Sequence, residues 1–388
     1  MLPNLRNQLV KFSHVLQTCL FARVEEAIGE ISEAGKRLLG VLTLLPLDRY
    51  IPVAQGWNGR PSKDRVAIAR AFVAKAVYNF PTTRDLLDRL QADAQLRRIC
   101  GWESAAQIPH ESTFSRAFAE FAGMQMPQMV HEALIRETQS TRLIGHIARD
   151  STAIETREKF PETAKQKLAK AGKSKATKPG KKPRKKPGPR PKDQPPPPLT
   201  RLQRQRHMTL EEMIADLPPS ECSIGVKTGS KGHQHYWRGY KLHLDVADGQ
   251  IPITALLTGA SLHDSQVAIP LATMTARRVT SLYDLMDSAY DAAEIHAHSR
   301  GLGHRPIIDP AHRGVRTRSV LRHQKTREFT GAESLRYRER TMSERVNARL
   351  KDEFGGRFVR VRGAAKVMAH LMFGVLALTV DQIIRLTG

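Results

Sequence analysis

Cysteine and acidic residues are both scarce in this sequence. The three cysteines (Cys19, Cys100 and Cys222) lie far apart and form no Cys-x-x-Cys pair, which argues against a zinc ribbon and against a disulfide scaffold. Only 38 Asp and Glu residues stand against 62 Lys and Arg residues, so the formal net charge is +24. A chain this basic is expected to have a polyanionic partner, and nucleic acid is the commonest one.

Long apolar runs are also missing. The longest run, residues 367–380, is interrupted by His370 and Thr379, and we expect it to be too short to cross a bilayer. The opening residues, MLPNLRNQLVKFSH, lack the apolar core of a secretory signal. Hydrophobic residues still make up 40% of the 388 positions, which is enough for the cores of two or three domains. These features predict a cytosolic protein that handles nucleic acid.

One segment has a composition of its own. Residues 161–206 contain sixteen basic and two acidic residues, ten prolines and no aromatic residue. Such a segment cannot form a core, and we expect a disordered basic, Pro-rich insertion over residues 157–215. A plain spacer is the alternative, but this density of positive charge favours a mobile arm that contacts DNA phosphates by releasing counterions. The predicted contacts are Lys181, Lys182, Arg184, Lys185 and Lys186.

The chain before this insertion has helical patterns. We expect Ser62 to cap a helix that stops before Pro81, and Thr82 or Thr83 to cap the next one. Ser112 is expected to cap a further helix with an aromatic stripe on one side. The pattern predicts an all-α N-terminal domain over residues 1–135, compatible with helix-turn-helix DNA binding. The stripe consists of Phe114, Phe118 and Phe121.

From residue 136 onward, strands and helices alternate. A strand is expected to end at Asp150, a hairpin to turn at Asp248-Gly249, and a further strand to end at Asp287. Asp264 follows the hairpin and is expected to cap a helix. This order predicts a mixed sheet flanked by helices over residues 136–388. Strand alternation puts Asp284 and Asp287 on different faces, and we prefer Asp287 as the functional residue.

A regularly spaced set of polar residues lies near the C-terminal end of the sequence. Tyr337, Arg340, Glu344 and Lys351 follow the spacing Y-(2)-R-(3)-E-(6)-K. On one continuous helix, all four side chains would line one face. The simpler interpretation is a solvated charged face in which Arg340 pairs with Glu344.

This spacing resembles the signature around the catalytic glutamate of bacterial insertion-sequence DDE transposases. ARDSTAIE resembles the first catalytic strand of that family and maps its aspartate onto Asp150. LYDLMDSAYD resembles the second block and maps onto Asp287, although Ala289 stands where the family usually has glycine. The stretch from Asp287 to Glu344 is too short for the large β-rich insertion of other members.

The resemblance implies a ribonuclease-H-like fold and a DNA transposase that binds the terminal inverted repeats of its element. It would cut DNA and transfer the strand, with Asp150, Asp287 and Glu344 as catalytic residues and metal ligands. Three carboxylates suit two divalent ions, Mg²⁺ or Mn²⁺. The expected partners are terminal-repeat DNA, target DNA and a second copy of the chain in the synaptic complex, in the bacterial cytoplasm near the nucleoid. The expected phosphate contacts are Tyr337, Arg340 and Lys351.

Two other functions remain open from the sequence. A stand-alone metal-dependent nuclease of the same fold would use the same carboxylates. A catalytically inert DNA-binding regulator would leave them without a role. His233, His235 and His243 lack accompanying cysteines, and we expect solvated positions for all three rather than a metal site.

Overall fold

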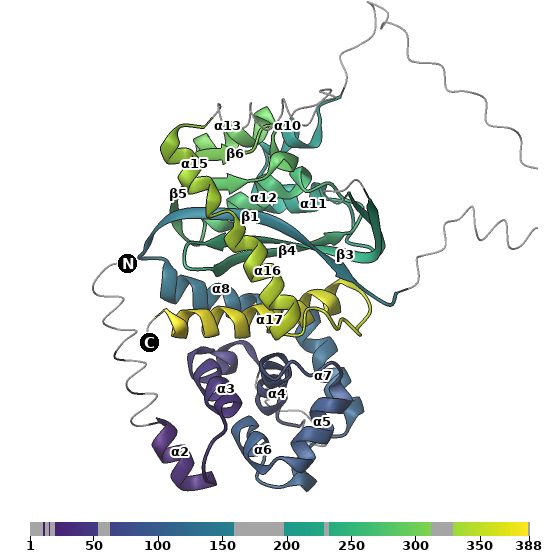
Figure 1. Ribbon diagram of the computed structural model, residues 1–388. Coiled ribbons are helices and arrows are strands. Elements are labelled where there is room, and N and C mark those ends of the chain that lie inside the picture. Colours follow the sequence, from purple (N-terminus) through teal and green to yellow (C-terminus); the bar gives the residue numbers. More distant parts are fainter. Residues whose placement is uncertain are drawn as a thin grey trace, which may run out of the picture.

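The computed structural model describes residues 11, 15, 20–52, 63–158, 198–228, 233–311 and 329–386. Helices of the N-terminal part form one end of the molecule, and a mixed sheet with its own helices forms the other (Figure 1). This arrangement confirms the expected fold class, a ribonuclease-H-like mixed α/β sheet preceded by an all-helical region. The predicted phosphate contacts between Lys181 and Lys186 lie outside the described residues.

The N-terminal part is built from short helices whose caps differ in part from those expected. Asp64, not Ser62, caps α4 by accepting hydrogen bonds from the first turn. Thr82 caps α5 as predicted, in a capping box with Asp85. His110 rather than Ser112 precedes α7. These helices are α2 (Phe21–Ile28), α3 (Glu33–Leu44), η2 (Leu47–Tyr50), α4 (Arg65–Val77), α5 (Thr83–Ala92), α6 (Ala94–Cys100), η3 (Ala105–Gln107), α7 (Glu111–Gly123) and α8 (Met126–Gln139).

An aromatic cluster holds the N-terminal helices together. The ring of Phe72 on α4 lies 4.9 Å from that of Phe118 on α7, and 5.6 Å from that of Phe373 on α17 (Ala364–Arg385). Phe114 and Phe121 are also buried, so the predicted stripe on α7 is confirmed. Tilted and edge-on aromatic pairs of this kind add stability beyond the area they bury.

Helix α17 corrects the expectation drawn from its apolar run. The helix has 22 residues, and by length and composition it could cross a membrane. It is mostly buried inside the protein, however, because the N-terminal helices α3, α4, α7 and α8 and strand β4 all contact it. Figure 1 shows α17 between the N-terminal helices and the sheet. Its hydrophobicity is therefore explained by its place in the core.

The sheet has the strand order β2-β3-β1-β5-β6, and β4 pairs with β3 outside this path. Strand β1 continues beyond Asp150, where we expected it to end, as far as Glu155. Strand β2 was not predicted. The hairpin between β3 and β4 is confirmed, and Gly249 in its turn has a φ of 82°, which glycine adopts without strain. The strands are β1 (Leu143–Glu155), β2 (Ser223–Thr228), β3 (Gln234–Ala247), β4 (Ile251–Gly259), β5 (Thr280–Met286) and β6 (Arg305–Ile308).

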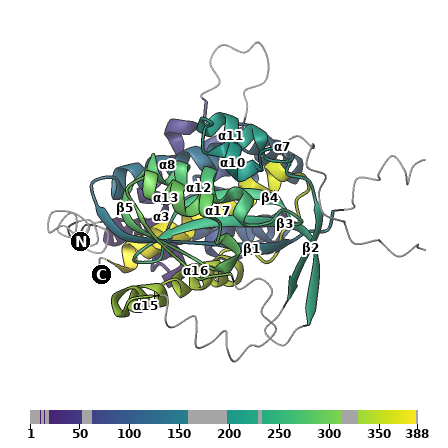
Figure 2. The ribbon, with the colours of Figure 1, turned by 90° about the horizontal axis from the view of Figure 1, so that it is seen from above.

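Helices cover both faces of the sheet (Figure 2). On one face lie α10 (Arg201–Gln205), α11 (Leu210–Asp216), α12 (Ser265–Ala276) and α13 (Ala293–Gly301), and on the other lie α15 (Gly331–Arg338) and α16 (Thr341–Glu353).

Helices α10 and α11 show that the predicted disordered insertion over residues 157–215 is wrong at its C-terminal end. Leu202 and Met213 join a core cluster with Ile269 of α12. Arg201 donates hydrogen bonds to Asp216 at 3.0 Å and to Gln266 at 2.7 Å. Apolar residues at helical spacing and two capping boxes distinguish this part from the Pro-rich run before it.

The single long helix expected around the Y-R-E-K spacing is also wrong. Helix α15 ends at Arg338 and α16 begins at Thr341. At the junction, the amides of Glu339 and Arg340 bond to carbonyls three residues back, at 3.0 Å each. The apolar pattern explains the break, because α15 buries no residue, whereas α16 buries residues at helical spacing against β1 and β3. These are Met342, Val346 and Leu350.

Candidate active site

Two of the predicted carboxylates come from neighbouring parallel strands. Strands β1 and β5 pair with Ala148 opposite Leu285. Continuing that register by two residues brings Asp287 level with Asp150 on the same face. Burial raises the pKa of Asp150 to about 6, and the nearby Asp287 carboxylate adds to the shift. Burial raises the pKa of Asp287 as well. The ionised form of each carboxylate is therefore costly in the protein alone, and a bound cation would offset that cost.

Helix α16 lies over Asp150 and contacts it through a residue that the sequence did not single out. The side-chain amide of Asn347 donates a hydrogen bond to Asp150 Oδ2 at 3.2 Å. Asn347 is 6% exposed, and no described residue bonds to its Oδ1 atom. It lies three positions after Glu344, so helical spacing from the predicted glutamate is the signal that points to it.

Glu344 does not lie with the two aspartates. It occupies the first turn of α16, its side chain is 54% exposed, and it accepts a hydrogen bond from Arg340 Nη2 at 2.8 Å. This is the Arg-Glu pair that the simpler interpretation of the spacing named. Among the described residues, no group of three or more His, Cys, Asp or Glu side chains is arranged to hold a metal ion.

The four residues of the Y-R-E-K spacing divide into two groups. Arg340 lies 5.8 Å from the ring centre of Tyr337, and its positive charge lowers the pKa of both Asp150 and Asp287. Tyr337, Arg340 and Glu344 thus gather at the start of α16. Lys351 lies about 10 Å farther along the helix. Burial lowers its pKa, and the nearby cations Arg357 and Lys227 lower it further.

The donor atoms around the aspartates fit a hard divalent cation. Asp150 and Asp287 offer carboxylate oxygens, and Asn347 Oδ1 is a buried carbonyl oxygen without a partner among the described residues. The buried hydroxyl of Tyr290 also has no partner there, and its pKa is raised well above the usual value by burial and by surrounding carboxylates, including Asp150 and Asp287. Oxygen-only donor sets of this kind suit Mg²⁺ or Mn²⁺ rather than zinc.

Asp264 corrects another expectation. It precedes α12, but its side chain makes no capping hydrogen bond within the described part of the chain. The carboxylate instead accepts a hydrogen bond from Lys241 Nζ at 2.9 Å. Burial would raise the pKa of Asp264, but His243, Lys241 and the Ser151 hydroxyl together lower it. Asp264 therefore stays ionised and contributes to the raised pKa of Asp287.

Asp284 lies on the opposite face from Asp287, as strand alternation predicted. It accepts hydrogen bonds from the Ser299 hydroxyl and, at 3.2 Å, from His304 Nδ1. Burial alone would raise its pKa, but His304, Arg149 and Ser299 hold it below the usual value. Arg149 also forms a two-pronged ion pair with Asp245, at 2.8 and 2.7 Å. This buried network supports the sheet from behind the candidate site.

One of the three histidines differs from expectation. His233 and His235 are exposed, but His243 is fully buried, with its Nε2 2.9 Å from the Thr258 hydroxyl. Burial lowers the pKa of His243 to about 4. A neutral histidine in a strand that pairs on both edges is a packed core residue, because its neighbours on β1 and β4 exclude water.

The described geometry is that of a sheet with paired acidic residues beneath a helix, the arrangement of a nucleic-acid-processing α/β domain. Residues 214–380 match the family described as Transposase DDE domain, and residues 31–120 match the family described as Transposase domain (DUF772). The chain belongs to the DDE transposases of insertion sequences. The first match begins after β1, so it includes Asp287 and Glu344 but not Asp150. No curated protein and no solved structure matches the chain.

Proposed function

We propose that this transposase cuts DNA at the ends of its element and joins the exposed 3′-hydroxyl to target DNA, with Asp150, Asp287 and Glu344 as its catalytic residues. The observation that carries the proposal is the register of the parallel strands β1 and β5. Its continuation by two residues brings the half-buried carboxylates of Asp150 and Asp287 level with each other, beneath the helix that bears Glu344. DDE transposases generally use divalent metal ions, and the two aspartates with Asn347 are the groups that would hold Mg²⁺ or Mn²⁺ here.

The protein side chains would prepare the site in distinct ways. Bound cations, two in this proposal, would supply Lewis-acid activation of the attacking oxygen and stabilise the leaving oxygen. Asn347 would fix the orientation of Asp150 through its amide hydrogen bond. Arg340, whose charge already acts on both aspartates, would hold a phosphate oxygen of the scissile strand in its planar fork.

Glu344 has a conditional role in this proposal. In the described structure its carboxylate is paired with Arg340 and largely exposed. A DNA phosphate offers Arg340 a stronger partner than an exposed carboxylate, whose pairing contributes only about 0.3–0.5 kcal/mol. Binding of DNA would therefore release Glu344 from Arg340 and let it turn toward Asp150 and Asp287. The three carboxylates would then come together only when DNA is bound.

DNA recognition is assigned to the basic parts of the chain. We propose that the N-terminal helices bind the terminal inverted repeats, and that Tyr337, Lys351 and the basic residues from Lys181 to Lys186 contact DNA around the site. A homodimer would bring two ends together in the synaptic complex. The expected setting is the bacterial cytoplasm, next to the nucleoid.

A strand-transfer assay tests the proposal. Duplex oligonucleotides from one end of the element would be incubated with the protein and a target plasmid in Mg²⁺ or Mn²⁺. Joined products that depend on the end sequence support a transposase. Cleavage without joining would instead identify a stand-alone nuclease, and binding without either reaction would identify an inert regulator.

A further inference from the structure

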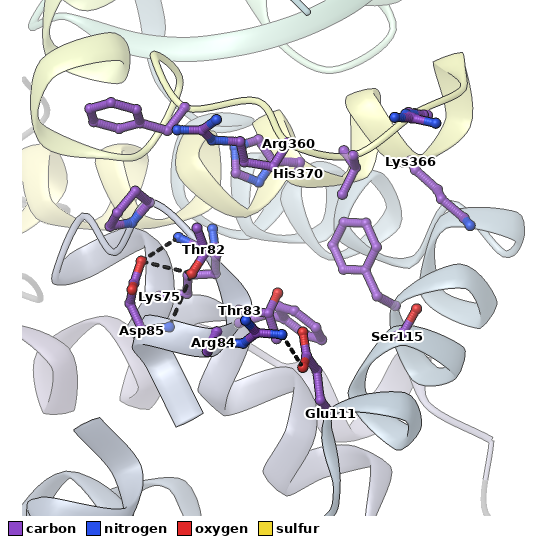
Figure 3. A pocket seen from close by; sticks show the side chains of 16 residues that line it. Lys75, Thr82, Thr83, Arg84, Asp85, Glu111, Ser115, Arg360, Lys366 and His370 are labelled. Carbon is purple, nitrogen blue, oxygen red and sulfur yellow. Dashed lines mark hydrogen bonds and ion pairs between the residues drawn. The ribbon is translucent and has the colours of Figure 1, made fainter. Parts of the chain in front are cut away.

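A cavity away from the aspartates is lined by basic side chains from both the N-terminal and the C-terminal parts of the chain. It has a volume of about 780 Å³ and lies between the N-terminal helices and the segment that joins α16 to α17. Figure 3 shows Arg360 and Lys366 on the C-terminal side, facing Arg84 and its neighbours on the N-terminal helices. Neither part of the chain forms this cavity alone.

The charges around the cavity do not balance. Five cations line it, against the two carboxylates Asp85 and Glu111. Asp85 is already engaged in the capping box with Thr82, and Glu111 pairs with Arg84 at 3.4 Å. Within the described residues, the other four cations have no hydrogen bond or ion pair from their side chains. These cations are Lys75, Arg360, Arg362 and Lys366.

Lys75 is the most unusual of the four. It belongs to α4, is only 8% exposed, and lines the cavity beside the apolar rings of Phe72 and Phe118. Burial lowers the pKa of its amine to about 8, with Asp85 opposing the shift. Burying an amine without a partner is costly, and an anion entering the cavity would remove that cost. The other ionisable group at its base, His370, has its pKa lowered to about 3 by burial and carries no charge at neutral pH.

The cavity continues toward the candidate active site. A shallower hollow of about 210 Å³ shares Phe358 and Arg360 with the cavity and reaches Glu155 at the end of β1. Asp150 lies five residues earlier on that strand, which corresponds to roughly 17 Å. Phosphates of one DNA strand advance about 3.4 Å per nucleotide along the axis of a duplex. A duplex lying along this line would therefore place the cavity at least about five nucleotides from the aspartates.

We infer that this cavity binds a backbone phosphate of the DNA being processed, at least about five nucleotides from the scissile bond. The inference rests on the proposed function, since it assumes that the candidate site acts on DNA. Because the N-terminal helices and the 358–366 segment each supply cations, a phosphate held there would fix the DNA relative to both parts. The position of the cut would then depend on this contact as well as on base recognition.

Salt titration of DNA binding gives the first test. The affinity of the full-length protein for an end-containing duplex would be measured at several salt concentrations for wild type, Arg360→Gln and Lys366→Gln. Each variant should reduce the slope of log affinity against log salt by about one. Arg49→Gln is the matched control, because Arg49 is an exposed cation of the N-terminal part that pairs with Glu137 away from the cavity. Equal slopes in all four proteins would overturn the inference.

Lys75→Met adds a readout that a merely structural residue would not give. Removing a buried, unpartnered amine should raise the melting temperature, while affinity for the duplex falls. A lower melting temperature together with unchanged affinity would contradict a ligand-binding role for Lys75.

Neutral methylphosphonate linkages, placed one at a time along each strand, locate the contact. One substitution at least about five nucleotides from the cut should weaken wild-type binding and leave Arg360→Gln binding unaffected. If no position shows this coupling, or if free mononucleotides displace the duplex competitively, the cavity is not a backbone site. Failure of the wild-type protein to bind any duplex would instead contradict the proposed function itself.

Discussion

At the scale of single residues, the two aspartates of neighbouring strands differ in what they contribute. Asp287 follows β5 on the side of α16, and Asp284 is buried on the other face in a network with His304 and Ser299. The alternation of side chains between the two faces of a strand was enough to distinguish these two aspartates from the sequence alone. The pairing of Glu344 with Arg340 was also foreseeable from the i,i+4 spacing. The contact between Asn347 and Asp150 was not, because it depends on how α16 crosses the sheet.

Asp287→Asn and Asp284→Asn should therefore affect different properties, the first DNA cleavage and the second stability. Asp287→Asn should abolish DNA cleavage while leaving stability and DNA binding nearly unchanged, because it removes one negative charge from the candidate site. Asp284→Asn should lower the free energy of unfolding by about 3 kcal/mol, since it removes a buried carboxylate that bonds to Ser299 and His304 and lies near the Arg149 charge. Cleavage assays and denaturant unfolding of both variants check this. Normal cleavage by Asp287→Asn would refute its catalytic role.

Asp150 should make the stability of the metal-free protein depend on pH. Its pKa in the folded state is about 6, above the ordinary value of 3.8, so the folded state retains a proton that the unfolded state loses. The resulting stabilisation is complete below pH 3.8 and is lost as the pH rises through about 6. Asp150→Asn should then be more stable than wild type by about 3 kcal/mol at pH 7.5 and by less than about 1 kcal/mol near pH 4.

Thermal melts at both pH values, in the presence of a chelator, measure this difference. Added Mg²⁺ should raise the melting temperature of wild type but not that of Asp150→Asn. A pH-independent difference between the two proteins would mean that Asp150 is not perturbed in the folded state.

Arg340 offers a test of the conditional role of Glu344. Arg340→Ala should slow strand transfer strongly but change the free energy of unfolding by no more than about 0.5 kcal/mol, because its pair with Glu344 is exposed. Arg340→Lys should not restore the rate, since a lysine ammonium group cannot form the two parallel hydrogen bonds that a planar guanidinium group makes to a phosphate. Rates would be compared at fixed salt with saturating Mg²⁺, with Lys351→Ala in parallel. Wild-type rates for Arg340→Ala would limit Arg340 to the surface pair.

At the scale of elements, the packing of α17 on α16 sets a strict limit on side-chain size. A Cβ atom added at Gly374 would lie 2.5 Å from the carbonyl oxygen of Phe354, the residue that ends α16. Gly374→Ala should therefore push the two helices apart and cost about 1–3 kcal/mol. Gly301→Ala in α13 is the control, because nothing lies within 4 Å of the added atom. Denaturant unfolding should show a loss for the first variant only; equal curves would mean that the helices adjust freely.

Element boundaries were only partly predictable. Thr82 caps α5 as expected because its side chain and that of Asp85 satisfy each other locally. The break between α15 and α16 was missed because the junction contains neither glycine nor proline, and the change lies in which residues become buried. Strand β2 was missed for a related reason. Among the described strands it pairs only with β3, and it leaves Ile224 and Val226 about half exposed.

At the scale of the whole molecule, we expect the basic insertion to contribute to DNA binding and not to folding. The deletion should span residues 161–197, since Arg201 and Leu202 begin a helix that packs on α12. The shortened protein should keep its melting temperature but bind DNA more weakly, with a flatter dependence on salt. A scrambled insertion of equal composition is the control and should behave like wild type. An unchanged salt dependence after deletion would show that the insertion does not contact phosphate.

The overall architecture could be predicted from the order of patterns along the chain. The packing of the N-terminal helices on the C-terminal helix α17 could not. Periodicity identified α17 as apolar without indicating that the N-terminal helices would pack on it. Phe72 and Phe373 are some three hundred positions apart, and no local pattern links them. The cavity lined by Lys75 and Arg360 depends on the same long-range packing, so it could not be anticipated either.

Helix α17 also links the timing of synthesis to activity. The N-terminal helices and the sheet both pack on residues 364–385, which leave the ribosome after every element they contact. At about 5–20 residues per second, the N-terminal helices, which end at Gln139, wait roughly 12–50 seconds for residue 385 with their shared apolar surfaces uncovered. A nascent or prematurely terminated chain would thus lack the scaffold that holds its helices against the sheet. Under the proposed function, only a chain translated through this helix would become competent to cut DNA, so incomplete products would not nick the genome.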